Sequence, residues 1–290
     1  MGTGKAAFPM MKLEYTADKP ALLLEFLRAR ELSKKAMTAV KHRGGRIEVN
    51  GTERTVRYQL QPGDVVTITF PPEPIGESMD PWDYPLNIVY EDEWLLVIDK
   101  PSGVAVIPTR RYPTHTLANA IIHHYLEAGL QSTVHFVNRL DKDTSGLLVV
   151  AKYRHIHHLL TRDIKQVKRR YLARVVGCPD PVAGTVDAPI ARLEELSVKR
   201  GIREDGQPSV THYQVLERDG ETSLVECILE TGRTHQIRVH MAYIGCPLVG
   251  DSLYGDASGV LGGQQLHSYF LVFSHPMTGE VLTFQRKPGN

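Results

Sequence analysis

Five prolines fall within one short stretch of this sequence, and they limit how the chain can fold. They are Pro71, Pro72, Pro74, Pro81 and Pro85. Proline has no backbone N–H and does not fit the interior of a helix or of a central strand. The same stretch contains acids but no Lys or Arg, which predicts a linker that does not bind phosphate. We therefore expect a small domain at residues 1–70, a linker at 71–85 and a larger domain at 86–290.

The charged residues are segregated along the chain, although the net charge is only +1. Residues 1–70 carry 12 Lys and Arg against 7 Asp and Glu, and residues 152–174 carry 8 against one. Between them, residues 71–99 carry 8 acids and no base. Two basic surfaces would suit a phosphate backbone, but such runs are equally typical of solvated faces.

Several classes of protein are disfavoured. Cys178, Cys227 and Cys246 form no CxxC pair, which argues against a disulfide framework or a structural zinc site. The 13 histidines form no HExxH motif. No apolar run approaches the roughly 20 residues that cross a bilayer, and the start of the chain shows neither a signal region nor a myristoylation pattern. We expect a cytoplasmic monomer that binds neither a membrane nor a metal.

The small domain is predicted to be α+β, with two helices followed by short strands. A leucine-rich face indicates a helix soon after residue 20, and Ser33 is a suitable N-cap for a second helix that ends at Gly44-Gly45. The pattern then alternates with period two at residues 46–49, as in a strand. Asn50-Gly51 predicts a hairpin turn directly after that strand.

Three segments of this domain, residues 30–36, 45–51 and 60–66, resemble the S4 RNA-binding domain. The family often has Arg where this chain has Lys34. The resemblance implies that the helix pair and its adjoining loop contact structured RNA through Arg30, Ser33, Lys34, Lys35, Arg46 and Asn50. The alternative is a small hairpin domain with no role in RNA binding.

The larger domain is predicted to be rich in strands. Apolar runs that fit sheet strands occur at residues 95–98, 147–151, 172–176 and 223–229. Helical patterns are limited to about residues 114–128 and 154–166. The predicted fold of the chain is thus α+β, with a mixed, mainly antiparallel β-sheet domain that holds a central cleft.

The segment with the most chemistry is residues 138–152, where a polar loop with two acids runs directly into an apolar strand. Loops at strand ends hold reactive groups well because the sheet positions them. Asp141, Asp143 and Ser145 imitate the first half of a calcium loop, but the bidentate Glu required at its twelfth position is Lys152. Without further information, an acid that caps a turn is the ordinary interpretation.

Four segments, in order, resemble motifs of the RluA-like pseudouridine synthases, which modify ribosomal RNA. They are residues 100–106, 138–152, 171–177 and 230–255. The family core Arg-Leu-Asp-x-x-Thr-Ser-Gly is matched at residues 139–146, which places its aspartate at Asp141. The sequence departs from the family at Asn138, where His is usual, and at Arg169, where Lys is common.

This resemblance implies a set of site residues and no cofactor. Asp141, Tyr171 and Arg233 would be catalytic, with Arg233 paired to the carboxylate of Asp141. The residues expected to bind the substrate are Asn138, Arg139, Thr144, Arg169, His235, Gln236 and Arg238. No metal or cofactor is needed, because the uracil never leaves the pocket.

The implied activity is site-specific conversion of uridine to pseudouridine in structured RNA, with large-subunit ribosomal RNA favoured. The sequence does not decide whether tRNA is also modified. Cleavage of the N-glycosidic bond places positive character on the ribose. Asp141 could stabilise that charge, attack C1′ or remove a ribose proton, and the sequence does not decide among these. One alternative is a catalytically idle RNA-binding or ribosome-assembly factor on the same fold. Another is a phosphate- or sugar-processing hydrolase, but the sequence has no Walker loop and no recognisable second acid.

Overall fold

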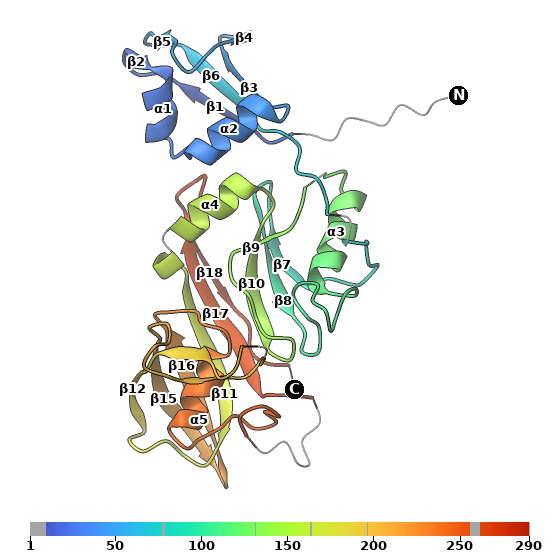
Figure 1. The fold of residues 1–290 in the computed structure, drawn as a ribbon, viewed down its shortest axis with the longest axis vertical. Helices are drawn as coiled ribbons and strands as arrows, with labels where there is room; N and C mark the ends of the chain where they lie inside the picture. Colours follow the sequence, from blue (N-terminus) through green and yellow to red (C-terminus); the bar gives the residue numbers. More distant parts are fainter. Residues whose placement is uncertain are drawn as a thin grey trace, which may run out of the picture.

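The computed structural model describes residues 10–76, 79–130, 132–162, 164–195, 197–255 and 262–289. A small sheet organises the N-terminal part, in the order β1-β6-β3-β4, and a ten-stranded sheet organises the remainder (Figure 1). The small sheet contains β1 (Lys12–Thr16), β3 (Arg46–Val49), β4 (Thr52–Glu53) and β6 (Val65–Thr69), beside the pair β2 (Ala21–Leu22) and β5 (Gln59–Leu60) and the helices α1 (Leu23–Ala29) and α2 (Lys34–His42). The helix pair followed by strands agrees with the prediction, but the two strands that precede the helices, β1 and β2, were not predicted.

Local sequence signals explain two of these elements. Ser33 Oγ accepts a hydrogen bond from the Ala36 N–H at 3.1 Å, so the predicted N-cap of α2 is confirmed. Val49 pairs with Thr52 across a two-residue turn. In that turn φ is 50° at Asn50 and 74° at Gly51, and positive φ at both central residues is the condition of the tight hairpin turn that Asn-Gly favours.

The large sheet follows the order β12-β15-β16-β11-β17-β10-β8-β7, with β18 beside β17 and β9 beside β10. Its strands are β7 (Ile88–Glu91), β8 (Leu95–Lys100), β9 (His135–Phe136), β10 (Ser145–Ala151), β11 (Lys168–Val176), β12 (Ala183–Asp187), β15 (Val210–Asp219), β16 (Thr222–Leu229), β17 (Leu266–Ser274) and β18 (Val281–Gln285). Within this sheet β10 and β17 are parallel, whereas the other pairings are antiparallel. The prediction of a mixed, mainly antiparallel sheet is confirmed.

The parallel contact between β10 and β17 requires a glycine. Gly146 pairs with Ser268 and has φ of 103°. A Cβ at this position would lie 2.3 Å from the Ser268 carbonyl oxygen, closer than any side chain tolerates. This close approach fixes the start of β10, just after the loop that carries Asp141.

Outside the sheets, the larger part contains the helices α3 (Leu117–Glu127), α4 (Arg154–Arg162) and α5 (Gln236–Tyr243), a 3₁₀ turn at Ile164–Gln166 and the hairpin β13 (Ile190–Arg192) and β14 (Arg200–Ile202). The first two helices match the predicted helical segments. The prediction that helical character is limited to those two segments was wrong, because α5 is a third helix. No helix in the described ranges is long and apolar enough to cross a membrane.

The Pro-rich segment packs against the larger part of the chain. Glu73 accepts hydrogen bonds from the Arg154 N–H at 2.7 Å and contacts His135 Nε2 at 2.5 Å. Just before the segment, Phe70 stacks on His155 with ring centroids 5.2 Å apart. The ion pair of Glu31 with Arg162 adds a contact between the N-terminal part and α4. The N-terminal part is therefore seated on α4, as Figure 1 also shows.

Replacing Glu73 by Ala should loosen this seating without unfolding either sheet. Loss of one mostly buried, charge-assisted contact lowers the local stability by about 1–3 kcal/mol, which corresponds to opening that is roughly 5- to 150-fold more frequent. Limited proteolysis within residues 71–85 should accelerate by that factor. Asp83→Ala is the matched control, because Asp83 is an exposed acid of the same segment. Equal cleavage rates for the two variants would contradict the role of Glu73.

Candidate active site

Asp141 lies in the loop that leads into β10, and the sheet holds this loop from both ends. The Thr144 N–H donates to the Asp141 carbonyl oxygen at 3.2 Å, which closes the turn. Asn138 Oδ1 accepts from the Val149 N–H of β10 at 2.9 Å. The side chain of Asp141 is 25% exposed. It is therefore a carboxylate on a rigid loop that remains reachable from solvent.

Lys100 anchors the Asp141 loop through hydrogen bonds to backbone carbonyl oxygens. Its fully buried ammonium donates to the carbonyl oxygens of Pro101 at 2.7 Å, Val104 at 2.9 Å and Lys142 at 2.8 Å. Burial lowers the pKa of Lys100 to about 8, and the charges of Asp143 and Asp141 oppose that shift. Lys100 lies in one of the motifs found in the sequence, but no role was predicted for it. The structure shows that it joins the segment after β8 to the Asp141 loop.

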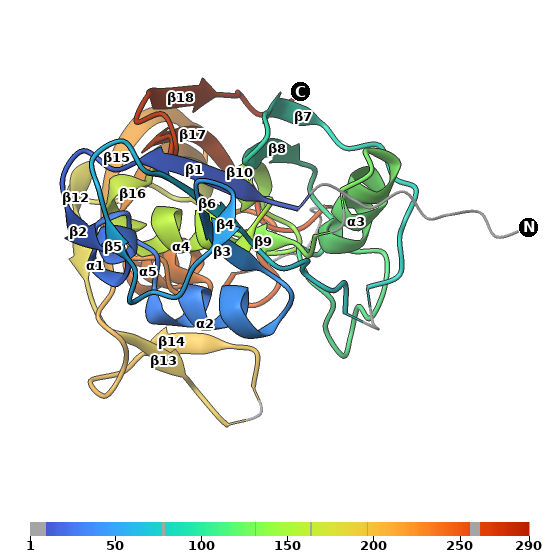
Figure 2. The same ribbon diagram turned by 90° about the horizontal axis from the view of Figure 1, so that it is seen from above.

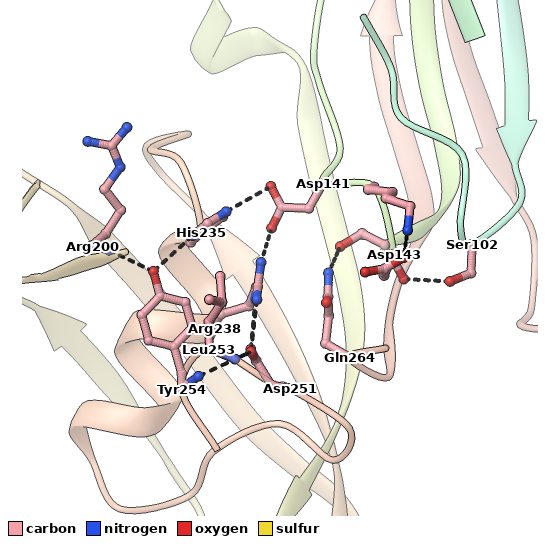
Figure 3. Close-up of polar contacts among 12 residues, drawn as sticks. Ser102, Asp141, Asp143, Arg200, His235, Arg238, Asp251, Leu253, Tyr254 and Gln264 are labelled. Atoms are coloured by element: carbon pink, nitrogen blue, oxygen red, sulfur yellow. Dashed lines mark hydrogen bonds and ion pairs between the residues drawn. The ribbon is translucent and has the colours of Figure 1, made fainter. Parts of the chain in front are cut away.

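Arg238 bridges two carboxylates (Figure 3). Its Nη1 donates to Asp141 Oδ2 at 3.1 Å, while Nε and Nη2 donate to the two oxygens of Asp251 at 2.7 and 2.8 Å. Asp251 is fully buried and also accepts from the backbone N–H groups of Leu253 and Tyr254. Burial alone would raise the pKa of Asp251, but the hydrogen bonds and charge of Arg238 outweigh it and lower the pKa. Asp251 thus fixes the direction in which Arg238 faces Asp141.

The predicted pairing of Arg233 with Asp141 was wrong. Arg233 is exposed and its Nε donates to the Pro208 carbonyl oxygen at 3.1 Å. Arg238, which had been expected only to bind substrate, forms that pair instead. The reason is the helix α5, since Arg233 precedes its start whereas Arg238 lies in its first turn, on the face that meets Asp251.

His235 approaches Asp141 from the N-terminus of α5. Its Nε2 lies 3.9 Å from Asp141 Oδ1, and its Nδ1 lies 2.8 Å from the Tyr254 hydroxyl. That hydroxyl accepts the Arg200 N–H at 2.8 Å, so its own hydrogen can be donated to Nδ1. Burial lowers the pKa of His235, against the opposing charge of Asp141. We infer a neutral imidazole whose proton is on Nε2 and faces Asp141.

Tyr171 lies on β11 and is 5% exposed. The strand pairing with β17 shifts register between Arg170 and Tyr171, and such irregularities redirect side chains near functional sites. The pKa of Tyr171 is raised, mainly by burial and also by the charge of Asp141. The charge of Arg169 and a hydrogen bond with Ser268 oppose this shift. The hydroxyl is therefore protonated at neutral pH and lies within the electrostatic reach of Asp141.

Three other predicted substrate residues are buried and make internal hydrogen bonds, although Asn138 Nδ2 has no partner among the described residues. Gln236 accepts from the Arg233 N–H at 2.9 Å and donates to the Val210 carbonyl oxygen at 2.9 Å. Thr144 Oγ1 accepts from Gln264 Nε2 at 3.1 Å, and Asn138 holds β10 as described above. These side chains maintain the framework of the site, and their contact with a substrate stays a prediction.

The two remaining arginines differ in their surroundings. Arg139 is exposed and has no described polar contact, so its side chain is available to a ligand. Arg169 is 8% exposed, and its Nε has no hydrogen-bond partner among the described residues. Its charge acts on Tyr171. An unpartnered buried donor beside that tyrosine is a feature that a polar ligand could satisfy.

A cavity of about 550 Å³ opens beside the Asp141 loop. It is lined by polar residues and by glycines, namely Ser102, Gly103, Lys142, Asp143, Gly250, Ser252, Gly262 and Gly263. A central cleft was predicted for the sheet domain, and this cavity lies beside the loop that carries Asp141. Across the described ranges, no three His, Cys, Asp or Glu side chains are grouped so that they could hold a metal ion.

The sequence model of the RNA pseudouridylate synthase family matches residues 94–243, more than half of the chain. The chain belongs to the RNA pseudouridine synthase family. It is 46% identical over 255 residues to the uncharacterized RNA pseudouridine synthase YjbO of Bacillus subtilis, covering 87% of this chain and 90% of that protein. It is 41% identical over 251 residues to the ribosomal large subunit pseudouridine synthase D of Pseudomonas aeruginosa, covering 81% and 78% of the two chains.

Solved structures agree with this family assignment. The human RNA pseudouridylate synthase domain containing 1 matches with a TM-score of 0.58 at 27% identity, over 73% of this chain and 85% of that one. The human RNA pseudouridylate synthase domain containing 4 matches with a TM-score of 0.56 at 29% identity, over 69% and 88%. The chain is thus an enzyme of the pseudouridine synthase class, and the predicted resemblance to this class is confirmed.

The two arginines near the site allow a paired test. Arg238→Lys keeps the charge but cannot hold Asp141 and Asp251 together, because an ammonium lacks the planar fork. We expect single-turnover formation of pseudouridine to fall about 10²–10³-fold, the loss typical of one preorganised donor. Arg233→Lys should stay within about twofold of wild type, because only a hydrogen bond to a carbonyl at the surface changes. A larger loss in Arg233→Lys than in Arg238→Lys would return the predicted role to Arg233.

Proposed function

We propose that this pseudouridine synthase isomerises specific uridines of large-subunit ribosomal RNA, with Asp141 as the essential carboxylate and without a cofactor. The observation that carries the proposal is the contact of Asp141 with Arg238, which is itself held by the buried Asp251. The relative from Pseudomonas aeruginosa, named for the ribosomal large subunit, supports the choice of substrate. Transfer RNA remains a second RNA substrate to assay.

The contacts of Asp141 indicate which of its two carboxylate oxygens faces the ribose. Cleavage of the glycosidic bond builds positive charge on the ribose, and a carboxylate beside C1′ stabilises it. Arg238 binds Oδ2, while Oδ1 faces His235 at the longer distance of 3.9 Å. Oδ1 is therefore the oxygen less engaged by the protein and the one we assign to the ribose, whether Asp141 attacks C1′ or removes a ribose proton.

Tyr171 is proposed to contact the uracil. Stacking of a base on an aromatic ring is worth roughly 1–3 kcal/mol. Because burial raises the pKa of Tyr171, its hydroxyl enters the reaction as a phenol. A role in removing the C5 proton of the reattached uracil then requires the phenol to release its own proton in the same step.

The N-terminal part is proposed to be an S4-like module that grips structured RNA. Lys34 and Lys35 are exposed at the start of α2, and Arg46 is exposed at the start of β3. The guanidinium carbon of the half-buried Arg30 lies 3.4 Å from the centroid of the Phe26 ring and 5.2 Å from that of the Tyr15 ring. These side chains support the proposal.

Two of the residues expected to bind RNA already have internal partners. Ser33 caps α2, as described above. Asn50 donates to Asp64 Oδ1 at 2.8 Å and accepts from the Val65 N–H at 2.9 Å. Both are therefore assigned to the shape of the module, and the gripping role is proposed for the three exposed cations and Arg30.

Asp141→Asn tests the proposal directly. The amide keeps the shape of the side chain but removes its charge, so pseudouridine formation in transcribed large-subunit ribosomal RNA should become undetectable by pseudouridine-specific chemical labelling. Affinity for that RNA should stay within a few fold. Turnover close to wild type would remove Asp141 from the mechanism. Absence of pseudouridine with the wild-type protein, despite tight binding, would favour the RNA-binding or ribosome-assembly factor.

Replacements of Tyr171 should separate stacking from proton transfer. Tyr171→Phe keeps the ring and should slow the single-turnover rate while the affinity for RNA changes little. Tyr171→Leu removes the ring and should weaken both, with binding reduced by about 1–3 kcal/mol. If the Phe variant is as fast as wild type, the hydroxyl has no chemical role and only the stacking role is retained.

A further inference from the structure

The β13–β14 hairpin places two arginines beside each other, and neither has an acidic partner among the residues that the structure describes. Arg192 and Arg200 are directly paired across its two strands, so their side chains leave the same face. Arg192 Nη1 donates to the Glu195 carbonyl oxygen at 3.0 Å, which neutralises no charge. Arg200 Nε is buried and has no hydrogen-bond partner in the part of the chain that the structure describes. Like charges in register destabilise a strand pair, so this arrangement has a cost.

Arg203, the residue directly after β14, shows how a neighbouring guanidinium is neutralised. Arg203 donates to both carboxylate oxygens of Asp205, through Nε at 2.9 Å and Nη2 at 2.7 Å. Within the described residues, neither Arg192 nor Arg200 has such an ion pair. Burial and the charge of Arg192 both lower the pKa of Arg200. Arg203 is therefore neutralised just after the hairpin, whereas the two arginines paired within it are crowded.

The hairpin is also coupled to the active site. The Arg200 N–H donates to the Tyr254 hydroxyl at 2.8 Å, and that hydroxyl lies 2.8 Å from His235, which faces Asp141. Figure 3 shows the guanidinium of Arg200 directed away from this network, so it is free for another ligand. Lys199 adds a third cation, with Nζ 5.8 Å from the centre of the Tyr254 ring.

The position of the β13–β14 hairpin suits a ligand that extends beyond the active site. Figure 2 shows the hairpin projecting from the body on the same side as α2, which carries Lys34 and Lys35. Leu193 and Val198, on the connection between β13 and β14, are 43% and 67% exposed. The paired arginines close the hairpin at its loop end, next to these uncovered apolar side chains. A loop end that carries both cations and apolar side chains is suited to a strand of nucleic acid, whose phosphates and bases it would contact respectively.

We propose that Arg192 and Arg200 form a phosphate-binding subsite that holds the backbone of the RNA beside the nucleotide facing Asp141. This subsite rests on the proposed function, because it assigns the ligand as RNA. A phosphodiester between the two guanidiniums would accept charge-assisted hydrogen bonds and remove their mutual repulsion. Through Tyr254, ordering of the hairpin by the bound strand would also hold His235 against Asp141.

The test uses Arg200→Gln in the full chain. The substitution leaves the backbone N–H that binds Tyr254 and removes only the guanidinium. Affinity for transcribed large-subunit ribosomal RNA should fall about tenfold at low salt. The slope of log affinity against log salt should shrink by roughly 0.7–0.9, the value for one phosphate contact. Arg192→Gln combined with Arg200→Gln should shrink it by about twice as much. Arg218→Gln is the charge-matched control, because Arg218 is exposed near the far end of β15 and should leave both quantities unchanged.

A second measurement separates binding from folding. Without RNA, the melting temperature of Arg200→Gln should be equal to that of wild type or higher, because a repulsion has been removed. A lower melting temperature with an unchanged salt slope would overturn the subsite and leave a structural role. A salt slope reduced equally in Arg218→Gln would also overturn it, as a nonspecific effect of charge. A smaller salt slope in Arg200→Gln would support the subsite even if the wild type forms no pseudouridine. In that case only the proposed reaction would be contradicted.

Discussion

Two carboxylates share one guanidinium at the centre of this enzyme, and the geometry of the site follows from that sharing. Asp251 is fully buried and takes two of the donors of Arg238, so its charge is compensated only while Arg238 remains in place. Removing one partner of a buried pair is strongly destabilising, commonly by about 3–5 kcal/mol. Arg238 is thereby held more firmly than Asp141 alone could hold it, and Asp141 receives a preoriented donor while it stays accessible.

The partners in this contact come from distant parts of the sequence, and the sheet is what brings them together. Asp141 precedes β10, Arg238 lies in the first turn of α5, and Asp251 follows that helix. The parallel contact of β10 with β17 at Gly146 fixes the end of the Asp141 loop, and Lys100 fixes its middle through the Lys142 carbonyl oxygen. A buried ammonium with three carbonyl acceptors has little freedom to move, so the loop has one position relative to α5.

The sequence predicted those features that depend on local interactions. The N-cap at Ser33, the Asn50-Gly51 turn and the apolar strand after Asp141 each follow from a few adjacent residues. The helix α5 was missed because it is buried on nearly all sides, polar residues included, so no apolar stripe marks its period. That omission led to the wrong arginine, since only a helix beginning at Gln236 turns Arg238 toward Asp141 and leaves Arg233 outside. The role of Lys100 was equally hidden, because its partners are backbone carbonyls that no residue pattern encodes.

The contacts outside the site suggest how binding of a long RNA could affect chemistry at one nucleotide. The N-terminal part is seated on α4 through Phe70 and His155, and Glu73 fixes the segment that follows. The helix α2, which carries Lys34 and Lys35, and the β13–β14 hairpin lie on the same side of the molecule (Figure 2). An RNA that touches both would be positioned by rigid elements at each end, and the hairpin end is joined to His235 through Tyr254. Free energy of binding far from the uridine would then help to align the reacting ribose with Asp141, which is how remote contacts raise the rate of a chemical step rather than only its affinity.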